Sequence, residues 1–295
     1  MFWFLLASQA FAAHDRAEDC PADFDGDGLV DGADLKVLLS QWDGPGESDL
    51  DGSGMVDAVD LTLLLSDWGE CPEDFLCGQL LVDERDGQSY TTRAVGPTCW
   101  MTENLNYGER IDSDDTGSLA TDDGVVQKFC YDEDPAICDT NGGLYSWEEA
   151  TAFEGSSNGV PSGTQGACPD GWHLPSDAEL QDLERFYGMD EEDVVLFEEW
   201  RGAGIGTDMK VGGASGFEGQ LSGWRDAVTG EYRNLNFYGG FWSATASDDK
   251  TTEYPEALNR GLLFPYDTVG RFAYDRRAAL SLRCVSDVLD DEWDS

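Results

Sequence analysis

The sequence predicts an α+β protein in two parts: a small all-α module with two calcium loops, then a loop-rich, disulfide-stapled α+β domain. Three observations predict this fold class. An acidic loop motif occurs twice near the N-terminus, at an offset of 26 residues, and each copy runs into an apolar stripe at helical spacing. Eight cysteines are spread along the chain. Beyond residue 77 the sequence is rich in Gly, Trp and Tyr, and only one segment reads as a well-capped helix.

Composition limits the classes of partner. The chain has 295 residues, 40% of them hydrophobic, so a sizeable core can form. Its net charge of −44 repels nucleic acid and anionic lipid and favours divalent cations. No apolar run reaches the length of a membrane span. We therefore expect neither nucleic acid nor a membrane span.

The N-terminus favours export. Residues 1–13 form an apolar run that ends in the small-residue triplet Ala10-Phe11-Ala12, as a signal peptidase requires, but a positive n-region is missing. This segment is therefore either a signal peptide or a retained apolar leader. With the cysteines considered next, it predicts a secreted, extracellular or cell-surface protein.

The cysteines predict disulfides. An even number without CxxC spacing, in a chain with two histidines, disfavours zinc. Eight cysteines allow 105 pairings, and position along the chain narrows them. Cys20 and Cys71 bracket the repeat, where closing a loop of about 50 residues would stabilise by roughly 4 kcal/mol. Cys130 and Cys138 could close a local loop, and Cys168 with Cys284 would join distant parts of the second domain, which leaves Cys77 with Cys99.

The repeated motif has the spacing of a calcium loop. Oxygen ligands recur at loop positions 1, 3, 5, 7, 9 and 12, with Gly28 or Gly54 at the turn, as a hard cation of six to eight oxygens requires. We predict two Ca²⁺ ions. The predicted ligands, with carbonyl oxygens at Leu29 and Met55, are Asp23, Asp25, Asp27, Leu29, Asp31 and Asp34 in the first loop, and Asp49, Asp51, Ser53, Met55, Asp57 and Asp60 in the second. Position 12 is Asp, one methylene shorter than the Glu of the EF-hand.

Each loop is expected to continue into a helix. Leu35, Leu38, Leu39 and Trp42 match Leu61, Leu64, Leu65 and Trp68 at spacing i, i+3, i+4 and i+7, so the two stripes are expected to face each other as a minimal core. The apolar residues at loop position 8, Val30 and Val56, are expected to pair the two loops through a short strand contact.

Residues 20–71, a duplicated loop and helix, resemble a type I dockerin. Cys20-Pro21-Ala22 and Gly44-Pro45-Gly46 break the chain before each loop, so no helix is expected there. The resemblance implies two calcium ions and docking onto a cohesin. Docking in that family involves a hydroxyl pair at loop positions 10 and 11, where this chain has Gly32-Ala33 and Ala58-Val59. The partner is therefore expected to be a cohesin-like protein or another copy of the chain.

Residues 72–77 read as a linker, 78–288 as the second domain and 289–295 as an acidic tail. In the second domain we expect a helix over 177–187, with Ser176 as N-cap and Glu179 completing a capping box. A second possible helix covers 146–153, and strands are expected at 240–245 and 279–285.

Ordered motifs give this domain a family resemblance. They are Gly87–Thr92, Trp100–Leu105, Gly143–Trp147, Cys168–Ser176, Phe241–Ser243 and Ser281–Val285. Residues 78–288 resemble the Fibrobacter succinogenes major paralogous domain. The resemblance implies a C-type-lectin-like or formylglycine-generating-enzyme-like fold and the Cys168–Cys284 closure, and it implies no settled activity.

No constellation in this domain predicts catalysis. His173 is expected to hydrogen-bond in a buried turn, the minority alternative being a ligand contact, and paired cysteines remove the thiol nucleophile. Acidic loops at 112–115 and 132–134 read as solvated, with extra calcium as the alternative. Glu253–Glu256 is a poor substitute for a lectin triplet. Core packing is expected for most of the aromatic and amide residues that could otherwise contact a sugar: Trp224, Tyr232, Asn234, Asn236 and Tyr238.

The leading functional hypothesis is a secreted, non-catalytic calcium-binding surface or matrix protein. Its dockerin-like module would serve attachment or assembly, and its lectin-like domain would bind glycan or protein. Two alternatives stay open: a subunit of a calcium-dependent homopolymeric filament or lattice, and a secreted carbohydrate-active enzyme.

Overall fold

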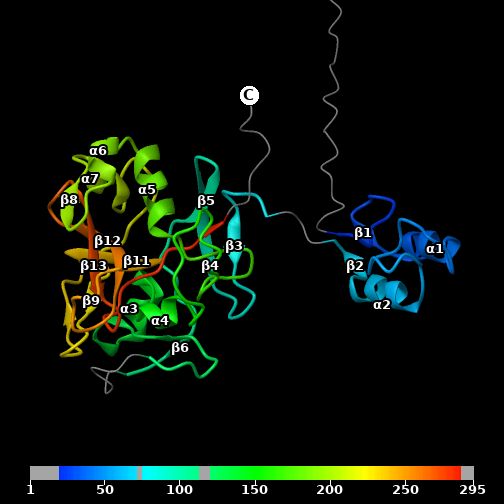
Figure 1. Cartoon of the computed structure of the whole chain (residues 1–295), viewed down its shortest axis with the longest axis horizontal. Coiled ribbons are helices and arrows are strands. Elements are labelled where there is room, and N and C mark those ends of the chain that lie inside the picture. Colours follow the sequence, from blue (N-terminus) through cyan, green and yellow to red (C-terminus); the bar gives the residue numbers. More distant parts are fainter. Residues whose placement is uncertain (1–19, 72–74, 113–119, 287–295) are drawn as a thin grey trace, which may run out of the picture. The chain divides into compact units, whose positions relative to one another are not determined.

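The computed structural model describes residues 20–71, 75–112 and 120–286, and the chain divides into two compact units between residues 74 and 75. Several predicted segments lie outside the described residues: the apolar leader at 1–13, part of the linker at 72–74, Ser113–Asp115 of one acidic loop and the tail at 289–295. The fold is a mixture of few helices and several small sheets (Figure 1). Four disulfides link its segments.

The N-terminal unit consists of two loop-helix copies. It contains β1 (Leu29–Val30), α1 (Gly32–Ser40), α2 (Ala58–Ser66) and β2 (Gly69–Glu70). Each helix begins with a capping box, in which an N-cap Asp and the Asp three residues later bond each other's backbone N–H groups. The end of each acidic loop is therefore also the start of a helix.

The core of this unit is smaller than the apolar stripes predict. Leu38 and Leu64 are fully buried, whereas Leu39, Leu65, Trp42 and Trp68 are exposed. The expectation that the whole stripes form the core is therefore wrong. A nine-residue helix has only two and a half turns, so one narrow face is covered when two such helices meet.

The two loops also do not pair with each other as expected. Val30 pairs with Gly69, which follows α2, and Val56 exchanges backbone hydrogen bonds with Asp43 and Gly44, which follow α1. Each loop therefore pairs with the segment after the other copy's helix. The physical reason is burial, because this crossed arrangement places both valines in the core between the helices.

Among its described residues, the C-terminal unit contains twelve further strands and six short helices. The first strands and helices are β3 (Leu80–Val82), β4 (Ser89–Val95), β5 (Thr98–Met101), β6 (Glu109–Arg110), β7 (Gln127–Lys128), the 3-10 helix η1 (Tyr131–Glu133), α3 (Pro135–Asn141) and α4 (Trp147–Ala150). The next are α5 (Asp177–Phe186), α6 (Glu191–Val194), β8 (Glu199–Arg201) and α7 (Ile205–Met209). The last are β9 (Trp224–Arg225), β10 (Tyr232–Arg233), β11 (Tyr238–Ala246), β12 (Glu256–Leu263), β13 (Val269–Asp275) and β14 (Val285–Ser286).

Two four-stranded antiparallel sheets organise this unit, in the orders β11-β12-β13-β8 and β14-β5-β4-β3. The first sheet is covered on both faces. Phe241 packs with the α5 residues Leu180 and Leu183 in one cluster, whereas its neighbour Trp242 packs with Trp147 of α4 in another. The period of two along β11 therefore sends alternate aromatic side chains to opposite layers.

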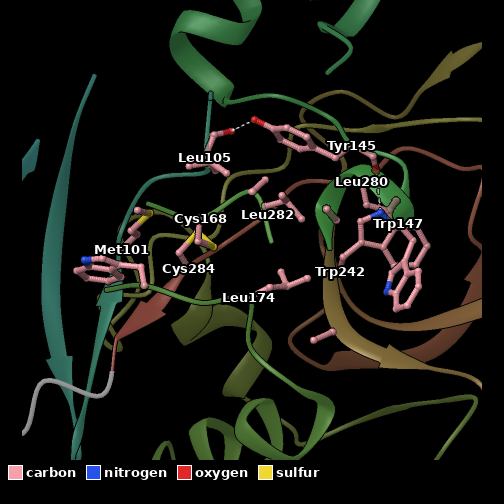
Figure 2. Close-up of a cluster of buried hydrophobic side chains, with 14 of the residues drawn as sticks. Met101, Leu105, Tyr145, Trp147, Cys168, Leu174, Trp242, Leu280, Leu282 and Cys284 are labelled. Atoms are coloured by element: carbon pink, nitrogen blue, oxygen red, sulfur yellow. Dashed lines mark hydrogen bonds between the residues drawn. A yellow bond between two sulfur atoms is a disulfide. The ribbon is translucent and has the colours of Figure 1, made fainter. Parts of the chain in front are cut away.

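The larger core gathers side chains that are distant in sequence (Figure 2). The Cys168–Cys284 disulfide lies among Met101, Leu174 and Leu282. Two buried aromatic side chains of this core have polar partners: the Tyr145 hydroxyl lies 3.3 Å from the Leu105 carbonyl oxygen, and the Trp242 indole donates to the Tyr145 carbonyl at 2.8 Å. These bonds allow aromatic side chains with polar atoms to be fully buried.

The structure confirms some of the elements predicted for this unit and contradicts others. The helix over 177–187 and its capping box are confirmed as α5, and the strand over 240–245 is confirmed within β11. The helix over 146–153 is shorter, covering Trp147–Ala150. The strand over 279–285 is wrong as a continuous element: this segment makes single bridges to several partners, because it crosses the core between the sheets.

Candidate metal centre

The first acidic loop brings three carboxylates together. Ligand oxygens of Asp23, Asp25 and Asp27 lie within 4.8 Å of one another. The backbone shapes the loop around Asp23, whose two oxygens accept from the N–H groups of Gly26 and Gly28, both at 2.8 Å. Gly28 has φ +86°, a left-handed conformation that suits glycine, so the sharp turn expected at loop position 6 is present.

The second loop repeats this geometry with a different trio. Oxygens of Asp49, Asp51 and Asp60 lie within 4.8 Å of one another. Asp49 accepts from the Gly54 N–H at 2.7 Å, and Gly54 has φ +93°. Ser53 stands where the first loop has Asp27, and its hydroxyl donates to the Met55 carbonyl at 3.1 Å. The second loop therefore has one carboxylate fewer at this position.

Other predicted ligands have structural roles as well. Asp31 and Asp57 lie outside the two carboxylate groups and cap α1 and α2, accepting from Ala33 and Val59 at 2.7 and 2.8 Å. Asp34, which also lies outside the first group, accepts from the N–H groups of Phe24 and Asp31, both at 2.8 Å. None of these contacts involves the Leu29 carbonyl. The Met55 carbonyl accepts the hydrogen bond from the Ser53 hydroxyl.

The residues present fit a hard divalent cation. Their donor atoms are oxygens, and most of the carboxylates are at least partly exposed, so water and ions reach them. Desolvation and the negative charges of Asp27 and Asp34 raise the pKa of Asp25, which shows that the carboxylates repel one another. A bound cation would neutralise that repulsion. By contrast, the Asp57 N–H holds the pKa of Asp60 below its usual range.

A third group, made of Cys20, Asp23 and Cys71, has metal-like spacing but different chemistry. Its two sulfur atoms form a disulfide, so neither is available as a thiolate ligand. The Cys71 sulfur lies 3.7 Å from an Asp23 oxygen. This disulfide therefore contacts the first loop directly.

All eight cysteines are paired. The disulfides are Cys20–Cys71, Cys77–Cys99, Cys130–Cys138 and Cys168–Cys284, which are the pairings expected from the sequence. Four disulfides are consistent with a secreted protein, because the cytosol keeps thiols reduced. In the described ranges, we find no helix with the length and apolar character needed to cross a bilayer.

Comparison with protein families identifies the second unit. Residues 94–286, more than half of the chain, match the model of the Fibrobacter succinogenes major domain. The chain belongs to this family. The match begins after β3 and within β4, so it covers most of the C-terminal unit and neither of the two acidic loops of the N-terminal unit. No curated protein and no solved structure matches the chain.

In the Fibrobacter succinogenes major domain, His173 lies in a buried turn. Its Nε2 atom is 2.7 Å from Glu179 Oε1, and the other Glu179 oxygen accepts from the N–H groups of Ser176 and Ser162 at 2.8 and 3.1 Å. The histidine therefore joins the capping box of α5 to the preceding turn. The structure therefore confirms the buried, hydrogen-bonded turn that the sequence predicts for His173.

The sugar-contact candidates chosen from the sequence are largely occupied by packing. Tyr238 is buried, Trp224 packs edge-on against Tyr274 at 5.8 Å, and Tyr232 packs on Tyr131 at 5.3 Å. Asn234 and Asn236 lie in an exposed turn with positive φ. The three aromatic residues are therefore held by packing, as expected for most of the candidates, whereas the two asparagines are exposed.

The described residues of the acidic loops at 112–115 and 132–134 belong to none of the carboxylate groups with metal-like spacing. Asp112 pairs with Arg110 at 3.3 Å, and Asp134 caps α3 by accepting from the Ala136 N–H at 3.0 Å. Near the weak lectin-like tetrapeptide 253–256, Arg277 covers the Tyr254 ring at 3.4 Å.

Sequence reasoning missed an exposed aromatic surface on the family domain. Trp200 of β8 lies 6.3 Å from Tyr266 with nearly parallel rings, and the exposed fractions are 38% and 58%. A Cβ atom at Gly261 or Gly270, on neighbouring strands β12 and β13, would lie within 3.4 Å of the Trp200 ring. The indole therefore covers two side-chain-free positions of the sheet. The available signal was a glycine on each of two paired strands, which marks a place where a large ring can lie close to the backbone.

Proposed function

We propose that this protein is a secreted, non-catalytic calcium-binding protein whose N-terminal unit serves attachment or assembly. The observation that carries the proposal is that each of the two loops gathers three carboxylates, Asp23-Asp25-Asp27 and Asp49-Asp51-Asp60, and that each loop starts a helix. Two such groups, which share loop positions 1 and 3, are harder to explain as solvated surface than one. Calcium would balance the repulsion within each loop and so order this unit.

The dockerin-like character of residues 20–71 belongs to the same proposal. The duplicated loop and helix support it, as do exposed apolar side chains at matching positions of both copies: Leu39 with Leu65, and Trp42 with Trp68. Such side chains are typical of surfaces that contact another protein. The expected partner is a cohesin-like protein or another copy of this chain. Ala33 and Val59 occupy loop position 11, where dockerins have a hydroxyl residue, so the contact surface is less polar than in that family.

Calorimetric titration of the calcium-free chain tests the proposal. We expect two ions bound per chain, with binding at one site lost in Asp25→Ala and at the other in Asp51→Ala. Both substitutions change loop position 3, so each is the matched control of the other. A chain that takes up no calcium would contradict the proposal. Size-exclusion chromatography with and without chelator then separates attachment from assembly, because calcium-dependent polymers would favour the filament or lattice alternative.

For the family domain we propose a C-type-lectin-like fold that binds uncharged glycan. The observation in favour is the Trp200–Tyr266 pair, because the exposed faces of nearly parallel rings can stack against sugar rings. The strongly negative chain would repel acidic polysaccharide, so a neutral one is the better candidate.

A glycan array of neutral oligosaccharides tests this second candidate on the full chain. Trp200→Ala and Tyr266→Ala should each reduce binding about tenfold, the scale of one aromatic contact. Phe186→Ala is the matched control, since Phe186 is an exposed aromatic residue on α5. Absence of any array signal would remove the candidate, and steady release of reducing sugar would instead favour the enzyme alternative.

A further inference from the structure

The N-terminal unit has an internal two-fold correspondence in its backbone pairing. The Val56 N–H donates to Gly44 and the Asp43 N–H donates to Val56. At an offset of 26 residues, Asp43 corresponds to Gly69, which pairs with Val30, and Gly44 corresponds to Glu70, which pairs with Leu29. The entry of each loop also matches. The Asp23 N–H donates to the Cys20 carbonyl at 3.0 Å, and the Asp49 N–H donates to the Gly46 carbonyl at 3.3 Å.

This correspondence gives the Cys20–Cys71 disulfide a counterpart. At the same offset, Cys20 corresponds to Gly46 and Cys71 to Pro45. Pro45 and Gly46 are consecutive residues, joined by a peptide bond, whereas Cys20 and Cys71 are joined through their sulfur atoms with their Cα atoms 5.7 Å apart. The second loop is therefore connected to its paired segment by the main chain, and the first loop by the disulfide.

The disulfide holds both sides of the first loop. On one side the Cys20 carbonyl accepts from Asp23, and on the other the Cys71 N–H donates to the Gly28 carbonyl at 3.0 Å. The Cys71 sulfur also contacts the Asp23 carboxylate at 3.7 Å. No equivalent of the Cys71 N–H bond is possible in the second loop, because Pro45 has no N–H.

We propose that Cys20 and Cys71 are positioning residues for the first calcium site, and that their disulfide replaces the main-chain link that orders the second site. The inference rests on the proposed calcium function. Without the disulfide, residues 20–22 and residue 71 are no longer linked to each other, so Asp23 and the turn at Gly28 must be ordered when the ion binds. The conformational entropy lost on ordering these residues lowers the calcium affinity of the first site. The second site keeps its affinity, since the Pro45–Gly46 peptide bond still closes its loop.

The test measures each site separately in the full chain. Asp51→Ala leaves the first site and Asp25→Ala leaves the second, and each is combined with Cys20→Ser/Cys71→Ser, which spares the other three disulfides. Calcium affinity is measured by calorimetry. We expect removal of the disulfide to weaken the first site about tenfold or more and to change the second by less than about threefold. Binding that persists at the second site also shows that the unit still folds.

The outcomes separate this inference from the function on which it rests. If neither single-site variant with its disulfide intact binds calcium, the proposed function fails. If both sites bind calcium but lose affinity equally on removal of the disulfide, or if neither loses any, the calcium function stands and the positioning role is overturned.

Discussion

Glu149 is an acidic side chain whose environment favours the protonated form. It lies on α4, is 3% exposed and accepts from the Gln127 N–H at 2.8 Å. Burial, with the nearby charges of Asp123 and Asp122, raises its pKa to about 7. Because the unfolded chain releases this proton near pH 4.5, the folded state binds more protons between these two values. Stability contributed by this group is therefore present below pH 4.5 and is lost as the pH rises to about 7.

Glu149→Gln should remove this pH-dependent loss. The amide oxygen can still accept from Gln127, so we expect the variant to be more stable than the natural protein by about 1–2 kcal/mol at pH 8 and equal to it at pH 4. In a unit of this size the gain corresponds to a rise in melting temperature of about 2–8 °C. Differential scanning calorimetry at the two pH values measures it.

The matched control for Glu149→Gln is Glu192→Gln, an exposed residue of α6, which should change neither value. A gain of equal size at pH 4 and pH 8 would mean that packing, and not protonation, is responsible. A loss at pH 8 would mean that the ionised carboxylate has a partner worth more than its burial costs.

At the scale of elements, α5 is fixed to the sheet by a buried network of charges. The Asp177 carboxylate forms ion pairs with Arg260 and Arg271, each at 2.6 Å. The Glu184 carboxylate forms ion pairs with Arg260 at 2.7 Å and with Arg201 at 2.6 Å. The arginines come from β12, β13 and β8, so one helix contacts three strands. Burial opposes ionisation of Asp177, but the two arginines hold its pKa well below the usual range.

Asp177→Asn should therefore be strongly destabilising, by about 3–5 kcal/mol, because it removes the carboxylate that pairs with Arg271 and leaves Glu184 as the one carboxylate facing both Arg260 and Arg201. Denaturation of the full chain, followed by the melting of the C-terminal unit, measures this. Asp182→Asn is the control on the same helix: its 2.7 Å pair with Arg185 is exposed and should be worth less than about 1 kcal/mol. A cost below 1 kcal/mol for Asp177→Asn as well would show that water or a rearranged side chain replaces the carboxylate.

The same helix shows what sequence reasoning can reach. Ser176, Glu179 and the apolar face of α5 are local signals within a dozen residues, and the structure confirms the helix they predict. The network is not local, since Arg260 lies 83 residues from Asp177 and Arg271 lies 94. An isolated arginine in a strand reads as exposed, and nothing nearby in the sequence marks its partner. The exposed Trp200 surface was missed for the same reason, because Tyr266, Gly261 and Gly270 reach it from other segments.

The two acidic loops of the N-terminal unit show the same division. The turn glycines and the helix starts follow from residues within one twelve-residue loop and were predicted. Which segment pairs with Val30 depends on how two copies cross, and the sequence contains two equally apolar choices. The disulfide pairings were predicted because position in the chain leaves few compatible sets, although position alone does not show that Cys71 touches Asp23.

At the scale of the whole molecule, each unit has its own core and its own disulfides. The N-terminal unit buries a small cluster around Val30, Leu38, Val56 and Leu64 and has one disulfide. The C-terminal unit buries three clusters and has the other three disulfides. A small cluster supplies little stability by itself, so the N-terminal unit should depend on bound ions far more than the family domain does.

Removing calcium from the full chain should therefore affect two calorimetric transitions unequally. An ion at 100 times its dissociation constant stabilises by about 2.7 kcal/mol, and two such ions in a unit of this size correspond to a shift of at least about 10 °C. We expect a chelator to lower the N-terminal transition by that amount or abolish it, and to move the C-terminal transition by less than about 2 °C. The Asp25→Ala/Asp51→Ala variant is the control, because its N-terminal transition should already be low and should ignore the chelator. A chelator that lowers the C-terminal transition equally would place a calcium site in the family domain, and one that moves neither transition would mean that the carboxylate loops fold without an ion.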